Sequence, residues 1–113
     1  MTSRRPYRPQ RVDDLRERIT LQRIEWVDDG YSTVERPVDV ATVFARIEPV
    51  KSQDEFIAGG IRATEAVNAH IRHRDDINTT WRFRWQGRTY HIEGIRNLDE
   101  RRQYLTLSAN WRP

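Results

Sequence analysis

The sequence contains no cysteine, and this absence limits both its chemistry and its means of stabilisation. Disulfide bridges and thiolate metal sites are excluded, so the chain suits a reducing compartment without depending on one. No apolar run approaches the roughly 20 residues that a transmembrane helix needs. The stretch 1–10 is basic and lacks the apolar segment of a signal peptide. We therefore expect a protein that is made in the cytoplasm and stays soluble there.

Recognisable catalytic motifs are also missing. The chain has no nucleophile elbow, no phosphate-binding P-loop and no zinc-protease motif. His70 and His73 are three residues apart on an expected strand, so they point to opposite faces and cannot chelate one metal without a bulge. His91 falls on the exposed face of an expected hairpin, and the acidic pairs at 28–29 and 75–76 are typical of turns. We predict no enzymatic activity, no cofactor and no metal site.

The length and composition favour one small domain that associates with other copies. A chain of 113 residues fits a single domain with a thin core. Hydrophobic residues make up 36% and charged residues 33%, so a lone monomer would be marginally stable and an oligomer is a natural answer. Among the 20 basic residues only Lys51 is a lysine. Arginine suits interfaces because it binds carboxylates and phosphates in a planar, bidentate way, although a GC-rich genome would give the same bias.

We divide the chain into a flexible basic arm at residues 1–14 and a single β-barrel domain at residues 15–113. Two prolines and four mutually repelling arginines oppose regular structure in the arm. The arm is either a disordered tail or a segment that docks on a neighbouring subunit or an acidic surface. Within the domain, the polar stretch 50–63 predicts a long projecting loop, with a helix-compatible piece at 52–58 and a flexible pair of glycines.

Alternation of apolar and polar residues predicts strands at 15–27, 33–48, 64–74, 80–86, 88–96 and 103–111. The apolar phase slips by one residue between Val40 and Val43, so the second strand needs a bulge or bend near residues 41–42. A two-residue hairpin turn is expected at 86–87, and a helical turn at 97–102. No strand–helix–strand rhythm is present. The fold class is therefore mostly β: a small antiparallel barrel or sandwich of about six strands, with one or two short helices.

The clearest strand alternates aromatic and basic residues, which leaves two interpretations open. Exposed Trp81, Phe83 and Trp85 would stack single-stranded bases while Arg82 and Arg84 met phosphates, as in a small OB-like barrel. Alternatively, the aromatic side chains form the core and the arginines point outward. We favour the core, because so small a domain cannot spare three large aromatic side chains.

Five segments together resemble the head–tail joining, or head-closure, proteins of tailed bacteriophages and gene transfer agents. They read LRERITLQR at 15–23, VDVATVFARIEP at 38–49, HIRHR at 70–74, GRTYHIEGI at 87–95 and NLDERRQYL at 97–105. Their order and spacing are more specific than any one of them. The resemblance runs from Leu15 to Trp111 and covers nearly all of the expected domain.

The resemblance implies a structural virion protein that forms a ring in the head–tail neck. Such a ring closes the DNA channel after packaging and joins the filled head to the tail. The implied partners are other copies of the chain, the portal and adaptor complex, the tail terminator or tail tube, and genomic double-stranded DNA, with no membrane. We prefer a hexamer, with a dodecamer as the alternative, and a tail-terminator-type ring protein stays open as a second virion role.

In some relatives the loop between the second and third strands plugs the channel, and by position that loop lies here at residues 51–62. The residues expected to close the channel are Asp54, Glu55, Phe56, Ile57, Gly59 and Gly60. The residues expected to contact subunits or line the channel are Arg72, Arg74, Arg82, Arg84, Arg101 and Arg102. The alternative for the loop is an exposed, variable segment without a gating role.

Overall fold

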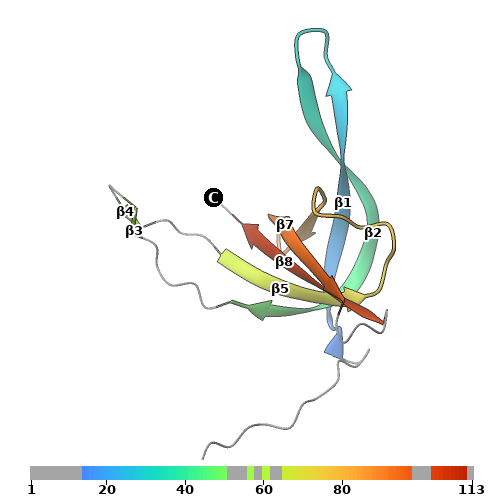
Figure 1. The fold of residues 1–113 in the computed structure, drawn as a ribbon, viewed down its shortest axis with the longest axis vertical. Helices are drawn as coiled ribbons and strands as arrows, with labels where there is room; N and C mark the ends of the chain where they lie inside the picture. The colour runs from blue at the N-terminus through green and yellow to red at the C-terminus, as the bar shows by residue number, and fades with distance from the viewer. Residues whose placement is uncertain (1–13, 51–55, 58–59, 62–64, 98–102, 112–113) are drawn as a thin grey trace, which may run out of the picture.

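The computed structural model describes residues 14–50, 56–57, 60–61, 65–97 and 103–111, and this part of the chain is almost entirely β-structure (Figure 1). No α-helix occurs within these ranges. The strands are β1 (Glu17–Asp28), β2 (Thr33–Pro49), β3 (Phe56–Ile57), β4 (Gly60–Ile61), β5 (Glu65–Arg72), β6 (Arg82–Trp85), β7 (Arg88–Asn97) and β8 (Tyr104–Trp111).

Six of these strands form a closed antiparallel barrel in the order β1-β2-β5-β8-β7-β6. The ring closes where β6 pairs with the middle of β1, with Phe83 opposite Leu21. Closure pairs the strand edges within the barrel, so the backbone groups there are not available for pairing with another chain. The predicted mostly-β fold of about six antiparallel strands is therefore confirmed.

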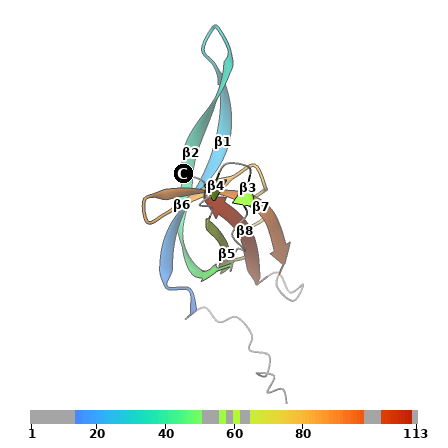
Figure 2. The same ribbon diagram turned by 90° about the vertical axis from the view of Figure 1, so that its left-hand side faces the viewer.

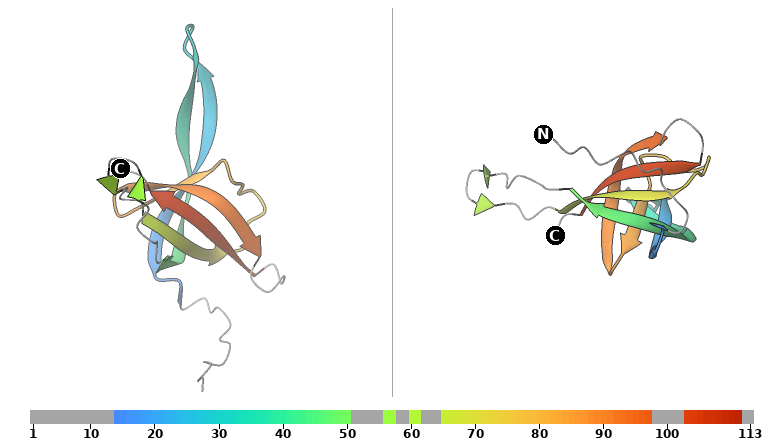
Figure 3. Two further views of the ribbon diagram at one scale, coloured as in Figure 1. Left: turned by 60° about the vertical axis from the view of Figure 1, so that its left-hand side comes forward. Right: turned by 90° about the horizontal axis from the view of Figure 1, so that it is seen from below.

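The predicted short helices have different outcomes. Within the segment 52–58, Phe56–Ile57 is a strand that pairs with Gly60–Ile61, and Figures 1 and 3 place this small ribbon away from the barrel. A helix through residues 56–57 is therefore a wrong prediction. Gly60 pairs with Ile57 in this two-stranded ribbon, so this glycine marks a tight strand pairing and not only a flexible joint. The expected helical turn at 97–102 begins on the last residue of β7, and the rest lies outside the described residues.

The core follows from the period-two alternation in each strand. Phe83 and Tyr90 lie opposite each other on β6 and β7 and stack with ring centroids 5.1 Å apart. Both side chains are fully buried. The other buried core residues are Ile19, Leu21, Ala45, Val67, Ala69, Ile71, Trp81, Ile92, Leu105, Leu107 and Ala109. Because these residues come from every barrel strand, one apolar interior holds the ring of strands together.

Two local irregularities shape the barrel. Leu21 pairs with Ala41 but Gln22 pairs with Asp39, so Val40 is an extra residue in β2. This bulge directly precedes residues 41–42, where the slip in the apolar pattern predicted it. At the β6–β7 hairpin, Gln86 and Gly87 have φ angles of 50° and 75°, the two positive values that a type I′ turn requires.

One feature was not predicted: β1 and β2 continue well beyond the barrel as a two-stranded ribbon (Figures 1 and 2). β1 pairs with β6 only at residues 20–22, and β2 pairs with β5 only at residues 45–49. From Arg23 to Asp28 on β1, the sole strand partner in the described structure is β2, in register until Asp28 meets Thr33. We call residues 23–38 the β1–β2 ribbon.

Candidate functional site

The base of the β1–β2 ribbon is fastened to β6 by polar side chains on the outside of the barrel. Arg82 forms an ion pair with Glu35, and Arg84 Nη2 lies 3.6 Å from Asp39 Oδ2. Gln22 Nε2 donates a hydrogen bond of 2.8 Å to the same aspartate. The two arginines thus face away from the core, as their alternation with aromatic residues predicted, and they link β6 to β2 at the base of the ribbon.

The middle of the ribbon carries a charge cluster of its own. Glu25 accepts hydrogen bonds from Arg23 and Arg36, at 2.5 Å and 2.6 Å. The bond from Arg23, followed by that from Arg36, lowers the pKa of Glu25. Because all three groups are exposed, the cluster orients the strands more than it stabilises them.

The tip of the ribbon is a tight turn that is shaped by two aspartates. Asp29 Oδ1 accepts hydrogen bonds from the backbone N–H groups of Tyr31 and Ser32, at 2.9 Å and 2.8 Å. Asp28 Oδ1 accepts one from Gly30, whose φ of +91° favours glycine. The backbone bonds from Ser32 and Tyr31 lower the pKa of Asp29, so the tip stays negatively charged at neutral pH.

Large apolar side chains are exposed along this end of the ribbon. Tyr31 is 99% exposed, Trp26 65% and Val34 42%. Among the described residues, no other strand lies beside this part of the ribbon, so the barrel does not cover these side chains. Exposed aromatic residues on a rigid, projecting element are typical of protein interaction sites.

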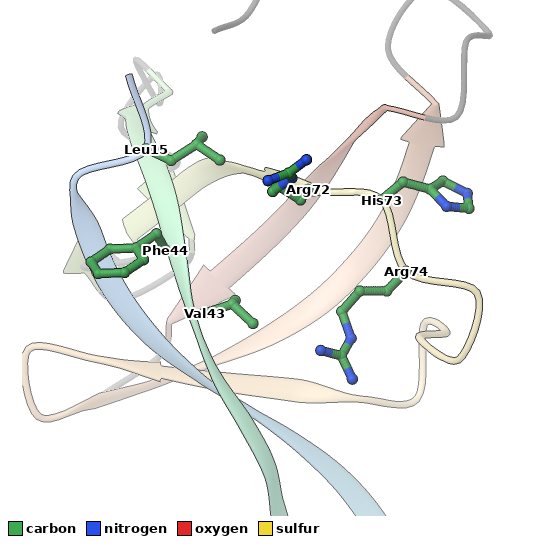
Figure 4. A pocket seen from close by; sticks show the side chains of 6 residues that line it. All are labelled: Leu15, Val43, Phe44, Arg72, His73 and Arg74. Atoms are coloured by element: carbon green, nitrogen blue, oxygen red, sulfur yellow. The ribbon is translucent and has the colours of Figure 1, made fainter. Parts of the chain in front are cut away.

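A hollow of about 400 Å³ lies at the opposite end of the β1–β2 pair (Figure 4). It is lined by a residue that precedes β1, by two β2 residues, by the last residue of β5 and by the two residues that follow β5: Leu15, Val43, Phe44, Arg72, His73 and Arg74. We call this hollow the basal groove. Its apolar side comes from Leu15 and from β2, and its basic side from the end of β5 and the start of the connection to β6, so residues far apart in sequence meet there.

The basic side of the basal groove has one arginine with no ion pair to any described residue. Arg74 donates two hydrogen bonds to the carboxylate of Asp76, at 2.9 Å and 3.0 Å, and these bonds raise the pKa of Arg74. His73 Nε2 lies 3.7 Å from Asp75 Oδ1. Arg72 is exposed and also lines a second hollow of about 390 Å³ with His73, Gln103 and Tyr104.

The apolar side of the basal groove includes a half-exposed ring. Phe44 is 52% exposed, whereas Leu15 beside it is 7% exposed. The guanidinium of Arg18 lies 5.3 Å from the centroid of the Phe44 ring. This cation–π contact orients the ring without covering it.

The structure separates the predicted site residues into different places. Arg72 and Arg74 lie at the basal groove, while Arg82 and Arg84 lie at the base of the ribbon. Of the predicted channel-closing residues, Phe56 and Ile57 form β3 and Gly60 begins β4. The remaining predicted residues lie outside the described part of the chain: Asp54, Glu55, Gly59, Arg101 and Arg102.

Sequence reasoning missed both the ribbon tip and the basal groove. Trp26, Tyr31 and Val34 flank the predicted turn, and three apolar residues around a turn signal would have been a usable hint. Phe44 is an apolar residue at an outward-facing position of β2, where the alternating pattern predicts a polar one. This departure from the pattern was a signal for an exposed aromatic residue.

His70 is buried in the barrel wall. Its Nδ1 lies 2.9 Å from the hydroxyl of Thr106 on β8, and its Nε2 lies 4.0 Å from Glu48 Oε1. Burial, and to a lesser degree the nearby charge of Arg46, lowers the pKa of His70. The imidazole is therefore neutral at neutral pH and serves as a cross-strand hydrogen-bonding group.

The aromatic residues at 81–85, in β6 and directly before it, do not form a base-stacking platform. Phe83 is fully buried and Trp81 is 7% exposed, so neither presents a ring face to solvent. Trp85 is half-buried against Tyr90, and its indole N–H donates to Glu17 at 3.4 Å. The interpretation of these aromatic side chains as core is confirmed, and the OB-like binding surface loses its structural basis. No helix in the described residues is long and apolar enough to cross a membrane.

Comparisons with known proteins bear on the role of this barrel. A family model described as phage head completion protein matches residues 11–110. The solved structures that match include the solution structure of protein SF1141 from Shigella flexneri 2a, with 28% identity and a TM-score of 0.66, over 90% of this chain and 96% of that one.

A chain from the virion of a native gene transfer agent particle also matches, with 17% identity and a TM-score of 0.70. The match covers 94% of this chain and 98% of that chain, and at this identity it speaks for the fold alone. No curated protein sequence matches significantly.

Proposed function

We propose that this chain, which belongs to the phage head completion protein family, forms a ring in the head–tail neck of a phage-like particle. Membership of that family indicates a structural, head-related virion role rather than an enzymatic one. The match across residues 11–110 carries the proposal, because it spans the whole barrel except the last residue of β8. The neck ring, its closing of the DNA channel and its joining of head to tail are the finer parts that we propose.

The closed barrel is consistent with such a ring. The strand edges within the barrel are paired in one chain, so neighbouring copies would meet through the barrel wall, the barrel ends or the β1–β2 ribbon, whose outer edges pair with no other described strand. The proposed neighbours are other copies of the chain, preferably six, with the portal and adaptor complex on one side and the tail on the other. We further propose that residues 51–62 close the channel over packaged DNA and that assembly takes place in the host cytoplasm.

The experiment that tests the joining role is to produce particles without this protein. We expect DNA-filled heads that remain without tails, and heads that lose their DNA, counted by electron microscopy and by nuclease-resistant DNA. Supplying the protein in trans should restore both. Fully tailed, infectious or DNA-transferring particles in its absence would overturn the proposal.

A second variant separates closing from joining. Replacing residues 51–62 by a short glycine–serine linker leaves the barrel strands intact, so tails should still attach. If those particles leak DNA, the segment closes the channel. If they retain DNA normally, the gating role is wrong while the joining role stands.

A further inference from the structure

We propose that the tip of the β1–β2 ribbon of one copy docks into the basal groove of the next copy, so that each chain uses two different surfaces to associate with its two neighbours. This inference deepens the proposed ring by naming the two surfaces that would meet in it. It rests on the chemistry of the ribbon tip and of the basal groove, which lie at opposite ends of the β1–β2 pair of one chain.

The tip is acidic and aromatic. From Trp26 to Val34 the chain carries the carboxylates of Asp28 and Asp29 and no basic residue. Tyr31 is 99% exposed at the end of the turn. Because Asp29 already fixes the turn through two backbone hydrogen bonds, the tip is ordered before it meets a partner, which lowers the entropy lost on binding.

The basal groove has the complementary character. Of the six described residues that line it, three are apolar, the other three are Arg72, His73 and Arg74, and none of the six is acidic. Arg72 is exposed and makes no ion pair with a described residue, so among these residues it is the cation best placed to meet a carboxylate of another copy. A hollow of about 400 Å³ lies in the lower part of the range of ligand pockets, so it can take an aromatic side chain.

Geometry requires that the partner be another molecule. The tip follows Asp28, the last residue of β1, and the basal groove contains Leu15, just before its first residue. Twelve strand residues at about 3.3 Å each separate the two by roughly 40 Å. A chain therefore cannot place its tip in its own groove. Contact between two different surfaces is heterologous and closes into a ring when the rotation between copies permits.

The absence of cysteine gives a clean test, since any disulfide must come from introduced thiols. We would introduce Tyr31→Cys and Phe44→Cys together and oxidise the purified protein mildly at high concentration. We expect a ladder of cross-linked oligomers on a non-reducing gel. The matched control pairs Tyr31→Cys with Glu93→Cys on the exposed face of β7, and its yield should be at least about tenfold lower. Equal yields from the two pairs would overturn the docking.

Single-cysteine variants test the direction of the contact. Tyr31→Cys mixed with Phe44→Cys should give a dimer and no ladder, because each copy then has one reactive surface. Efficient dimers of Tyr31→Cys alone would mean that tip meets tip, which contradicts the proposal. Adding Arg72→Glu should slow the 31–44 cross-link roughly tenfold, since a like charge then opposes the acidic tip.

The same cysteine pair in assembled particles separates this inference from the proposed function. Particles that contain the protein and carry tails, yet show no 31–44 cross-link there or in the purified protein, would refute the docking and leave the joining role intact. Absence of the protein from particles would refute the joining role, and the purified-protein yields would still decide the docking.

Discussion

Phe83→Ala tests whether the aromatic strand is core, and its effect can be estimated from burial. The Phe83 side chain is fully buried and stacks on Tyr90 at 5.1 Å. Truncation of a buried phenylalanine costs about 3–5 kcal/mol, a range that includes the lost contacts and the remaining cavity. A domain of 113 residues has about 6–17 kcal/mol of stability, so the variant should lose roughly a sixth of it or more.

Phe44→Ala is the matched control, because it removes the same atoms from a ring that is 52% exposed. We expect a loss of about 1 kcal/mol or less, part of it from the contact with Arg18. Urea unfolding followed by circular dichroism gives both values, at a protein concentration low enough for the midpoint to be independent of concentration. The melting temperature of Phe83→Ala should fall by roughly 15–25 °C.

The comparison has a clear refuting result. If Phe83→Ala loses no more stability than Phe44→Ala, the Phe83 ring is not part of the core. The strand would then be available to stack bases, and the nucleic-acid interpretation would return.

Three further changes test local features of the barrel. His70 has a pKa below its ordinary 6.5 in the folded protein, so the unfolded chain binds the proton more tightly. The free energy of unfolding should therefore fall as the pH drops below about 6.5. In His70→Gln, the urea midpoints at about pH 7 and about pH 5 should differ less than they do in the parent protein. Gly87→Ala places a side chain at a φ of 75° and should cost about 1 kcal/mol, whereas Gly94→Ala, whose added Cβ would lie 3.9 Å from its nearest neighbour atoms on β8, should be close to neutral. A double-mutant cycle of Arg82→Ala and Glu35→Ala should give a coupling of about 0.5–1 kcal/mol that weakens in high salt.

Each of these changes also has an outcome that contradicts it. An unchanged pH dependence in His70→Gln would assign the acid sensitivity to other groups. Equal losses in the two glycine variants would mean that the β6–β7 turn does not need its positive φ. A coupling of zero would mean that the ion pair does not fasten the ribbon to β6.

The fold was largely predictable from local pattern. Alternation located all six barrel strands to within a few residues, and the phase slip located the β2 bulge to one residue from Val40. The turn at Gln86 and Gly87 was predicted from residue type alone. These features are local, because a period of two and a positive φ are decided by neighbouring residues. The helix expected across residues 56–57 failed for the opposite reason: its short polar pattern permitted both a helix and a tight strand pair.

The candidate site was much less predictable. The arginines at 82 and 84 were expected to face outward and do so, but the sequence gives no sign that they bind Glu35 and Asp39 across the sheet. Sequence reasoning missed the ribbon because alternation shows which residues form a strand. It does not show where the neighbouring strands of the barrel end and leave part of that strand without a further partner. The basal groove was missed because Leu15, Phe44 and Arg72 are separated by dozens of residues.

The strands, the tight turns, the inward aromatic side chains and the lack of thiol chemistry could be derived from the sequence, since each depends on residue type and short-range periodicity. The closing of β6 on β1, the extension of the β1–β2 pair beyond the barrel, and the meeting of Leu15 and β2 with Arg72 in one groove follow from the tertiary structure alone. Those outcomes depend on which distant strands pair and in what register. Such pairings are set by the packing of the whole core, which no single stretch of sequence contains.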